Sequence, residues 1–193
     1  MLRQRVIDEA LAGTLPTSSF VRQWHQDSLH GVQLAERWVA GNYRGQGPAG
    51  SQLSRYVNQV DGVEGAPASR VTKLVNDTFS ELTRQAALLD ARRAAGQDLA
   101  QLYADLLPLC AWIHGQWVRI HPFADHNGSV ARLLALSVGL RYGLPLPLPG
   151  KPRNSAPIAA AGLTVNYNLA ASNQMLGDDR AMISYLHLAL ASP

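Results

Sequence analysis

Residues 121–132 read His-Pro-Phe-Ala-Asp-His-Asn-Gly-Ser-Val-Ala-Arg, and the apolar segment 133–140 follows directly. Twelve residues thus bring together a histidine that can accept a proton, a carboxylate, an Asn-Gly turn and a guanidinium. The apolar segment predicts that this run leads into a helix. Unpaired N–H groups and the helix dipole favour an anion at a helix start. A base, a carboxylate able to hold a metal and a phosphate cradle in one loop indicate chemistry on a nucleotide.

Outward from this loop, apolar periodicity predicts a mainly α-helical bundle. Besides the helix after the loop, helices are expected over residues 1–12, 20–40, 67–89, 98–118, 155–175 and 178–191. Six of the sixteen glycines fall between residues 41 and 65, so this region is expected to be non-helical. Within it, residues 53–60 read as a strand that precedes an Asp61-Gly62 hairpin turn. The expected fold class is therefore all-α with a short β-hairpin flap.

Length and composition predict one domain over residues 1–193. The N-terminal residues have no apolar core of a secretory signal, and no apolar run approaches the roughly 20 residues of a membrane span. A single cysteine, Cys110, lies in an apolar stretch and indicates a reducing compartment. We therefore expect a cytoplasmic protein, with a secreted effector as the alternative.

The net charge of +3 comes from scattered arginines and forms no basic patch that alternates with aromatic residues. The sequence thus predicts no nucleic-acid partner and no membrane partner. A metal hydrolase is a rival reading, because His114, His121, Asp125 and His126 are all possible ligands. Their spacing differs from the helical His-Glu-x-x-His pair, which disfavours that reading.

The pattern His-Pro-Phe-x-Asp-x-Asn-Gly with an arginine four residues later closely resembles the core motif of the Fic (Fido) family of nucleotidyl transferases. The element Gly41-Asn42-Tyr43-Arg44 resembles the Gly-x-aromatic-Arg element that precedes the β-hairpin flap in this family. The resemblance covers about residues 20–190, which implies that these residues form the core of the domain, with residues 1–19 as an N-terminal helical extension. It implies the compact α-helical Fido fold, carrying a flap.

The resemblance also implies a reaction: transfer of a nucleoside monophosphate, most often AMP from ATP with Mg²⁺, to a protein hydroxyl. ATP or another nucleotide would be the co-substrate. His121 would be the catalytic base and Asp125 the magnesium ligand, while the transferred phosphate would lie at Asn127 and Gly128. Arg132 would bind the distal phosphates. By the same resemblance, two residues near the C-terminus, Tyr167 and Asn173, are candidates for the base pocket.

The family also implies partners. A target protein would dock on the flap, residues 51–62, by strand addition. Many family members carry an inhibitory helix with a Ser/Thr-x-x-x-Glu motif, but no glutamate of this chain has Ser or Thr four residues before it. A separate inhibitory protein is therefore a possible further partner.

Two motif positions depart from the family pattern: His126 stands where the family has glycine, and Ser129 where it has arginine. A lost charge-assisted contact to phosphate costs on the order of 2 kcal/mol. A side chain at position 126 is expected to hinder close approach of the backbone to phosphate. Three alternatives follow: weakened adenylylation, a different phosphate-containing donor, or a degenerate, non-catalytic Fido-fold binding module.

Overall fold

The computed structural model describes residues 2–34, 36–47, 51, 53, 57–148, 158–160 and 163–191, with only the backbone described for 158–160 and 163–165. The described elements are α1 (Leu2–Leu11), α2 (Ser18–Ser28), the short 3₁₀ helix η1 (Arg37–Val39), β1 (Gln59–Val60), β2 (Val63–Glu64), α3 (Ala68–Ala94), α4 (Leu99–Ile120), α5 (Asn127–Arg141), β3 (Ile158–Ala160), β4 (Leu163–Val165), α6 (Tyr167–Met175) and α7 (Arg180–Ala191).

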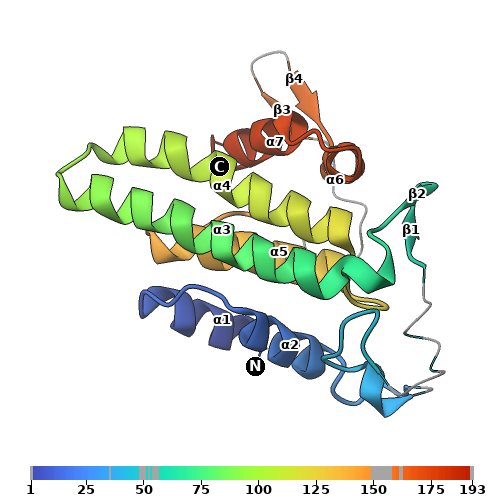
Figure 1. Ribbon diagram of the computed structural model, residues 1–193. Coiled ribbons are helices and arrows are strands. Elements are labelled where there is room, and N and C mark those ends of the chain that lie inside the picture. The colour runs from blue at the N-terminus through green and yellow to red at the C-terminus, as the bar shows by residue number, and fades with distance from the viewer. Residues whose placement is uncertain are drawn as a thin grey trace.

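Helix α4 is the central element of the bundle and packs against α3, α5, α6 and α7 (Figure 1). Its predicted apolar face is buried, as the exposed fractions of Leu102, Leu106, Leu109, Ile113 and Trp117 show. Helices α1 and α2 lie on the other side of α5, against which both pack. The predicted helical bundle is therefore confirmed, and the motif helix α5 is its second buried element.

Side-chain caps explain where several helices begin. The Thr17 hydroxyl accepts the Phe20 N–H at 3.3 Å, and the Asp98 carboxylate accepts the Gln101 N–H at 3.3 Å. Asn166 caps α6 by accepting the Asn168 N–H at 2.7 Å. Each cap satisfies an N–H group that the helix itself leaves unpaired.

The expected hairpin is present as the antiparallel pair β1–β2, in which Val60 pairs with Val63. Asp61 and Gly62 form its turn with φ of 50° and 80°, the positive values that a two-residue hairpin turn requires. The strand begins at Gln59 rather than at residue 53. Of the predicted flap 51–62, residues 52 and 54–56 lie outside the described part of the chain.

Two helix predictions are wrong. The helix expected over 20–40 ends at Ser28, because the chain turns there and Gly31 takes a positive φ of 78°. The helix expected over 155–175 is confined to α6, since a second antiparallel hairpin, β3–β4, precedes it. The β-branched residues Thr164 and Val165 favour a strand there, and Asn166 then starts the helix.

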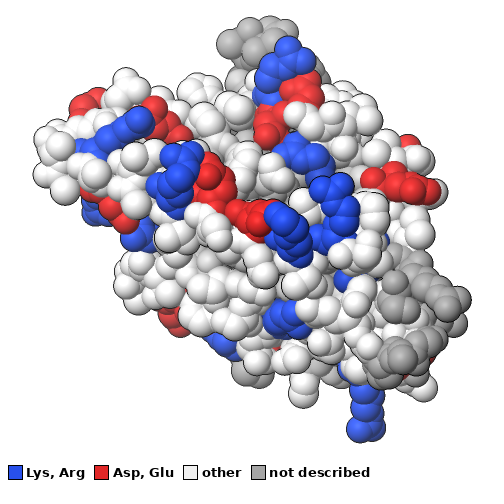
Figure 2. All heavy atoms as spheres, viewed as in Figure 1, with Lys and Arg blue, Asp and Glu red and all other residues white. Residues whose placement is uncertain are grey.

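Basic and acidic side chains are interspersed on the face that Figure 2 shows. Among the described residues, neighbouring side chains of opposite charge form ion pairs, such as Arg84–Glu81 at 2.7 Å and Arg92–Asp105 at 2.6 Å. Among the described helices, none combines the length and apolar character needed to cross a bilayer. Cys110 is fully buried, and burial raises the pKa of its thiol.

Candidate active site

A pocket of about 280 Å³ gathers residues of the motif, the first hairpin and α6. Its motif residues are His121, Asp125, Asn127, Gly128 and Arg132. The hairpin adds Val60 and Asp61, and α6 adds Tyr167, Asn168, Ala171 and Ser172. We call it the motif pocket. The five residues that the sequence assigns to base, metal and phosphate roles therefore line one cavity.

His121 ends α4 in a left-handed conformation, with φ of 51°. Its Nδ1 lies 2.8 Å from the Val118 carbonyl oxygen. Because a carbonyl can only accept, Nδ1 must carry the proton, and the basic lone pair of the neutral imidazole is on Nε2. The local fold thus selects the tautomer that a general base requires.

Arg44 fixes the end of α4 from inside the protein, where its side chain is only 1% exposed. Its Nε donates to the His121 carbonyl at 2.7 Å, and its Nη2 donates to the carbonyls of Ala66 and Ile120 at 2.7 and 2.8 Å. These carbonyls include the negative end of the α4 dipole, which stabilises the buried charge. Gly65 packs so closely that a Cβ there would lie 2.8 Å from the His121 Cβ.

The loop after His121 is anchored by one ring and two amides. Phe123 is fully buried and stacks on His25 with ring centroids 3.8 Å apart, so it anchors the loop to the core. The Asn127 side chain accepts the Phe123 N–H at 2.9 Å and donates to the Phe123 carbonyl at 2.8 Å. Asn58, just before the hairpin, donates to the same carbonyl at 2.8 Å. The side-chain amide of Asn127 therefore holds the loop in shape, and the group that Asn127 would offer to an anion is its backbone N–H.

The first turn of α5 presents backbone N–H groups to the motif pocket. The N–H groups of Ser129 and Val130 donate to the His126 carbonyl at 3.0 and 3.1 Å. Those of Asn127 and Gly128 come earlier in the turn, where a helix supplies no acceptor of its own. Both residues line the pocket. They form the kind of helix N-terminus that binds phosphate.

Gly128 offers a way to separate anion binding from folding. A Cβ built on it meets only Arg132 Nη1, at an ordinary 3.6 Å, so the protein itself does not require glycine there. Alanine is favoured over glycine in a helix by about 1 kcal/mol. We expect Gly128→Ala to leave the free energy of unfolding unchanged or higher, while nucleotide affinity falls by about tenfold because the methyl group enters the phosphate position. Urea denaturation and calorimetry check this; unchanged affinity would contradict the assignment of a phosphate to this turn.

Arg132 lies one turn into α5 with hydrogen bonds to two neutral oxygens. Its Nη2 donates to Ser129 Oγ at 3.2 Å, and its Nη1 donates to the Tyr167 hydroxyl at 3.4 Å. Within the described part of the chain, Arg132 forms no ion pair with a carboxylate. Its charge is therefore available to an anionic ligand.

Behind Arg132, a chain of hydrogen bonds runs into the core. Gln174 Nε2 donates to the Ala111 carbonyl at 2.7 Å, so its Oε1 is the atom that accepts from His114 Nδ1 at 2.6 Å. His114 Nε2 then carries a lone pair and accepts the Tyr167 O–H at 2.8 Å. The Tyr167 oxygen consequently presents only acceptor character to Arg132. Tyr167 lines the motif pocket, and its hydroxyl orients Arg132; its assignment to the base pocket stays a prediction.

Two buried histidines, His114 and His25, are expected to make the stability of the protein depend on pH. Burial lowers the pKa of both His114 and His25 from 6.5 to about 4. Between pH 6.5 and 4 the unfolded chain therefore binds protons that the folded protein does not. The free energy of unfolding should fall as the pH is lowered through this window, by about 1.4 kcal/mol per pH unit for each histidine. Urea denaturation at pH 6.5, 5.5 and 4.5 measures the slope. His114→Gln should reduce it, exposed His187→Gln should not, and a flat profile would contradict the prediction.

Asp125 is the candidate magnesium ligand. Its side chain is 78% exposed and lines the motif pocket, and one oxygen accepts the His126 N–H at 2.6 Å. Within the described residues, no group of three or more His, Cys, Asp or Glu side chains could hold a metal. Mg²⁺ is commonly held by one or two carboxylates together with substrate phosphates. Asp61, which hydrogen-bonds to Ser172, is a second carboxylate on the pocket wall.

Three predicted positions do not line the motif pocket. The His126 ring instead lies edge-on to His25, with centroids 6.3 Å apart, and its backbone takes a φ of 60°. Its side chain is thus directed to the protein rather than to the phosphate position. Asn173 lies on α6, beyond Asn168, which does line the motif pocket. Ser129 lines a neighbouring pocket instead.

Sequence reasoning missed the supporting residues: the polar chain behind Arg132, the buried Arg44 cap and the Asn58 amide. His114 and Gln174 are 60 residues apart and gave no local signal. Arg44 belongs to the Gly-x-aromatic-Arg element noted in the sequence, but nothing in that element indicated that the arginine would be buried and cap α4.

The fold and the motif pocket define a helical domain in which His121, at the end of α4, lies in one pocket with the start of α5. A model of the Fic/DOC family matches residues 16–138, so the chain belongs to the Fic/DOC family. Domains of this family are commonly nucleotidyl transferases.

The chain is similar to two known proteins over different shares of its length. A Fido domain-containing protein from Dictyostelium discoideum is 39% identical over 59 residues, which are 31% of this chain and 41% of that protein. The crystal structure of a Fic domain containing signaling protein from Bacteroides thetaiotaomicron is similar in fold, with a TM-score of 0.56 and 20% identity over 98% of this chain and 65% of that one. The chain thus spans less than two thirds of each relative.

Proposed function

We propose that the protein transfers a nucleoside monophosphate, AMP from ATP in the first instance, to a hydroxyl group of another protein, with His121 as general base. The observation that carries the proposal is the hydrogen bond from His121 Nδ1 to the Val118 carbonyl. It places the basic lone pair on Nε2, in the pocket that also contains the start of α5 and Arg132.

In this reaction His121 Nε2 accepts the proton of the target hydroxyl while the hydroxyl oxygen forms a bond to the α-phosphorus. The bond from the α-phosphorus to the bridging oxygen breaks, and pyrophosphate leaves. The N–H groups of Asn127 and Gly128 stabilise the charge on the transferred phosphate, and Arg132 binds the distal phosphates. Mg²⁺, held by Asp125 and phosphate oxygens, would neutralise charge on the donor.

The target would dock on the first hairpin. The β1–β2 pair is a two-stranded sheet, and its turn residue Asp61 lines the motif pocket. An extended target segment that pairs with a strand edge would bring its hydroxyl towards His121. We place this activity in the cytoplasm, with a separate inhibitory protein as a possible regulator.

A specific observation favours a second candidate, a binding module without transfer. Among the described residues, Arg132 is the one arginine of the motif pocket, because Ser129 replaces the arginine of the family pattern. The same observation is compatible with a donor other than ATP.

The test is incubation with ATP, GTP, UTP or CTP labelled on the α-phosphate, together with a cell lysate. Labelling of a protein by ATP that is lost in His121→Ala supports the proposal. Labelling by another nucleotide alone would support the transfer reaction, with that nucleotide as the donor in place of ATP. No labelling and no nucleotide binding by calorimetry would favour the binding module.

A further inference from the structure

A second pocket, of about 190 Å³, adjoins the motif pocket and shares Arg132 with it. Its polar residues are Arg3 of α1 and Ser129 and Arg132 of α5, and four leucines complete its wall. We call it the Arg3 pocket. The serine that replaces the motif arginine therefore opens onto a cavity that has an arginine from another helix.

Helix geometry explains why Arg3 faces α5. Arg3, Val6 and Ala10 follow a spacing of three and four residues, so they lie on one face of α1. Val6 and Ala10 are fully buried, and α1 packs against α5. Arg3 therefore stands at the end of the packed face, at the level of Arg132.

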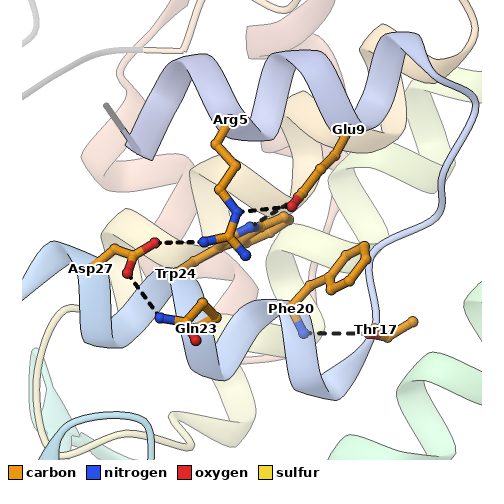
Figure 3. A network of polar contacts seen from close by, with 7 residues as sticks. All are labelled: Arg5, Glu9, Thr17, Phe20, Gln23, Trp24 and Asp27. Atoms are coloured by element: carbon orange, nitrogen blue, oxygen red, sulfur yellow. Dashed lines mark hydrogen bonds and ion pairs between the residues drawn. The ribbon is translucent and has the colours of Figure 1, made fainter.

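A polar network holds α1 in this position (Figure 3). Arg5 Nε lies 3.0 Å from Glu9 Oε1, and Arg5 Nη1 lies 3.0 Å from Asp27 Oδ2 on α2. Trp24 Nε1 donates to Glu9 Oε2 at 3.2 Å. Two of these contacts, Arg5 to Asp27 and Trp24 to Glu9, join α1 to α2 and fix the helix that carries Arg3.

The charges of this region are unevenly matched. Arg5 is paired with two carboxylates, whereas neither Arg3 nor Arg132 forms an ion pair with any described carboxylate. Arg3 and Arg132 are like charges that line one cavity and therefore repel each other, and because Arg3 is exposed, solvent screens part of this repulsion. An anion in the Arg3 pocket would remove this repulsion.

We propose that Arg3 binds the terminal phosphates of a nucleoside di- or triphosphate, in place of the charge that the motif lacks at Ser129. The identity of the ligand rests on the function proposed above. Arg132 joins the two sites, because its Nη1 faces Tyr167 in the motif pocket and its Nη2 faces Ser129 in the Arg3 pocket. A donor whose α-phosphate lies at Gly128 would extend past Arg132 towards Arg3.

Calorimetry with ATP, ADP, AMP and tripolyphosphate, each with Mg²⁺, tests the proposal on the full chain. Arg3→Gln should weaken binding of ATP and tripolyphosphate by about five- to tenfold, the effect of losing one charge-assisted contact at an exposed side chain. AMP binding should stay within about twofold. Arg3→Lys should retain most of the ATP affinity. Arg93→Gln, the same charge change at an exposed residue near the end of α3, is the matched control and should alter none of the four affinities.

A rescue variant sharpens the test. Ser129→Arg in the Arg3→Gln background should restore ATP affinity, since it returns a positive charge to the same pocket. An equal loss for ATP and AMP, or no loss beyond the Arg93→Gln control, would overturn the proposal. So would a wild-type protein that binds none of the polyphosphates.

The outcome is separable from that of the labelling test. Arg3-dependent ATP binding without any labelled target would keep the Arg3 site and remove the transfer reaction. If target labelling occurs and its dependence on ATP concentration is the same in Arg3→Gln as in wild type, the transfer reaction is supported and the proposed Arg3 site is contradicted.

Discussion

His121→Ala should lower the rate of transfer by about 10²- to 10⁴-fold, the usual contribution of a general base. The substitution removes Nε2, whose lone pair is set by the hydrogen bond between Nδ1 and the Val118 carbonyl. Nucleotide affinity should change little, because the phosphates are assigned to the start of α5 and to Arg132. The measurement is the initial rate of target labelling at saturating nucleotide, with affinity determined by calorimetry.

The control addresses the backbone, since His121 has a φ of 51°. Asparagine adopts this conformation more readily than alanine, so His121→Asn preserves the end of α4 while it also lacks the base. Both variants should lose transfer to a similar degree. A rate within threefold of wild type in either would show that another group accepts the proton.

Arg44→Met should lower the free energy of unfolding by about 3 kcal/mol or more, because each buried polar group left without a partner costs about 1–3 kcal/mol. Three carbonyls, those of His121, Ala66 and Ile120, would lose their donor. Methionine has a similar length and no donor, so the change isolates the hydrogen bonds from the packing. Urea denaturation measures the effect.

Arg84→Met is the matched control for Arg44→Met. Arg84 is exposed on α3 and pairs with Glu81, and such surface pairs contribute about 0–1 kcal/mol. A loss below 1 kcal/mol in Arg44→Met would mean that the end of α4 is held by packing alone. In that case the geometry of His121 would not depend on the buried guanidinium.

Local signals predicted the motif loop and most of the helices. Pro67 and Asp98 mark the starts of α3 and α4, and Asp61-Gly62 marks the hairpin turn. The motif placed His121 at the end of one helix and Arg132 within the next. These features depend on backbone preferences and spacing within about 15 residues, which sequence patterns report well.

Long-range packing explains what the sequence could not show. The apolar residues after Ser28 keep a helical spacing, yet the chain turns at Gly31, which takes a φ of 78°. His114 could be read as a metal ligand until Tyr167 and Gln174, more than 50 residues away, are seen to satisfy both its nitrogens. Similarly, nothing near Arg3 in the sequence indicates that it would lie beside Arg132.

Helix α1 has a consequence for how this protein is divided into units. The family match covers residues 16–138, and α1 lies entirely before it. Yet Val6 and Ala10 are fully buried, and Glu9 binds the indole of Trp24 inside the matched region. The part of the chain that packs together is therefore longer than the part that matches the family model. A fragment cut at the homology boundary would expose the apolar side of α5 and discard a wall of the Arg3 pocket, so its properties would not be those of the domain.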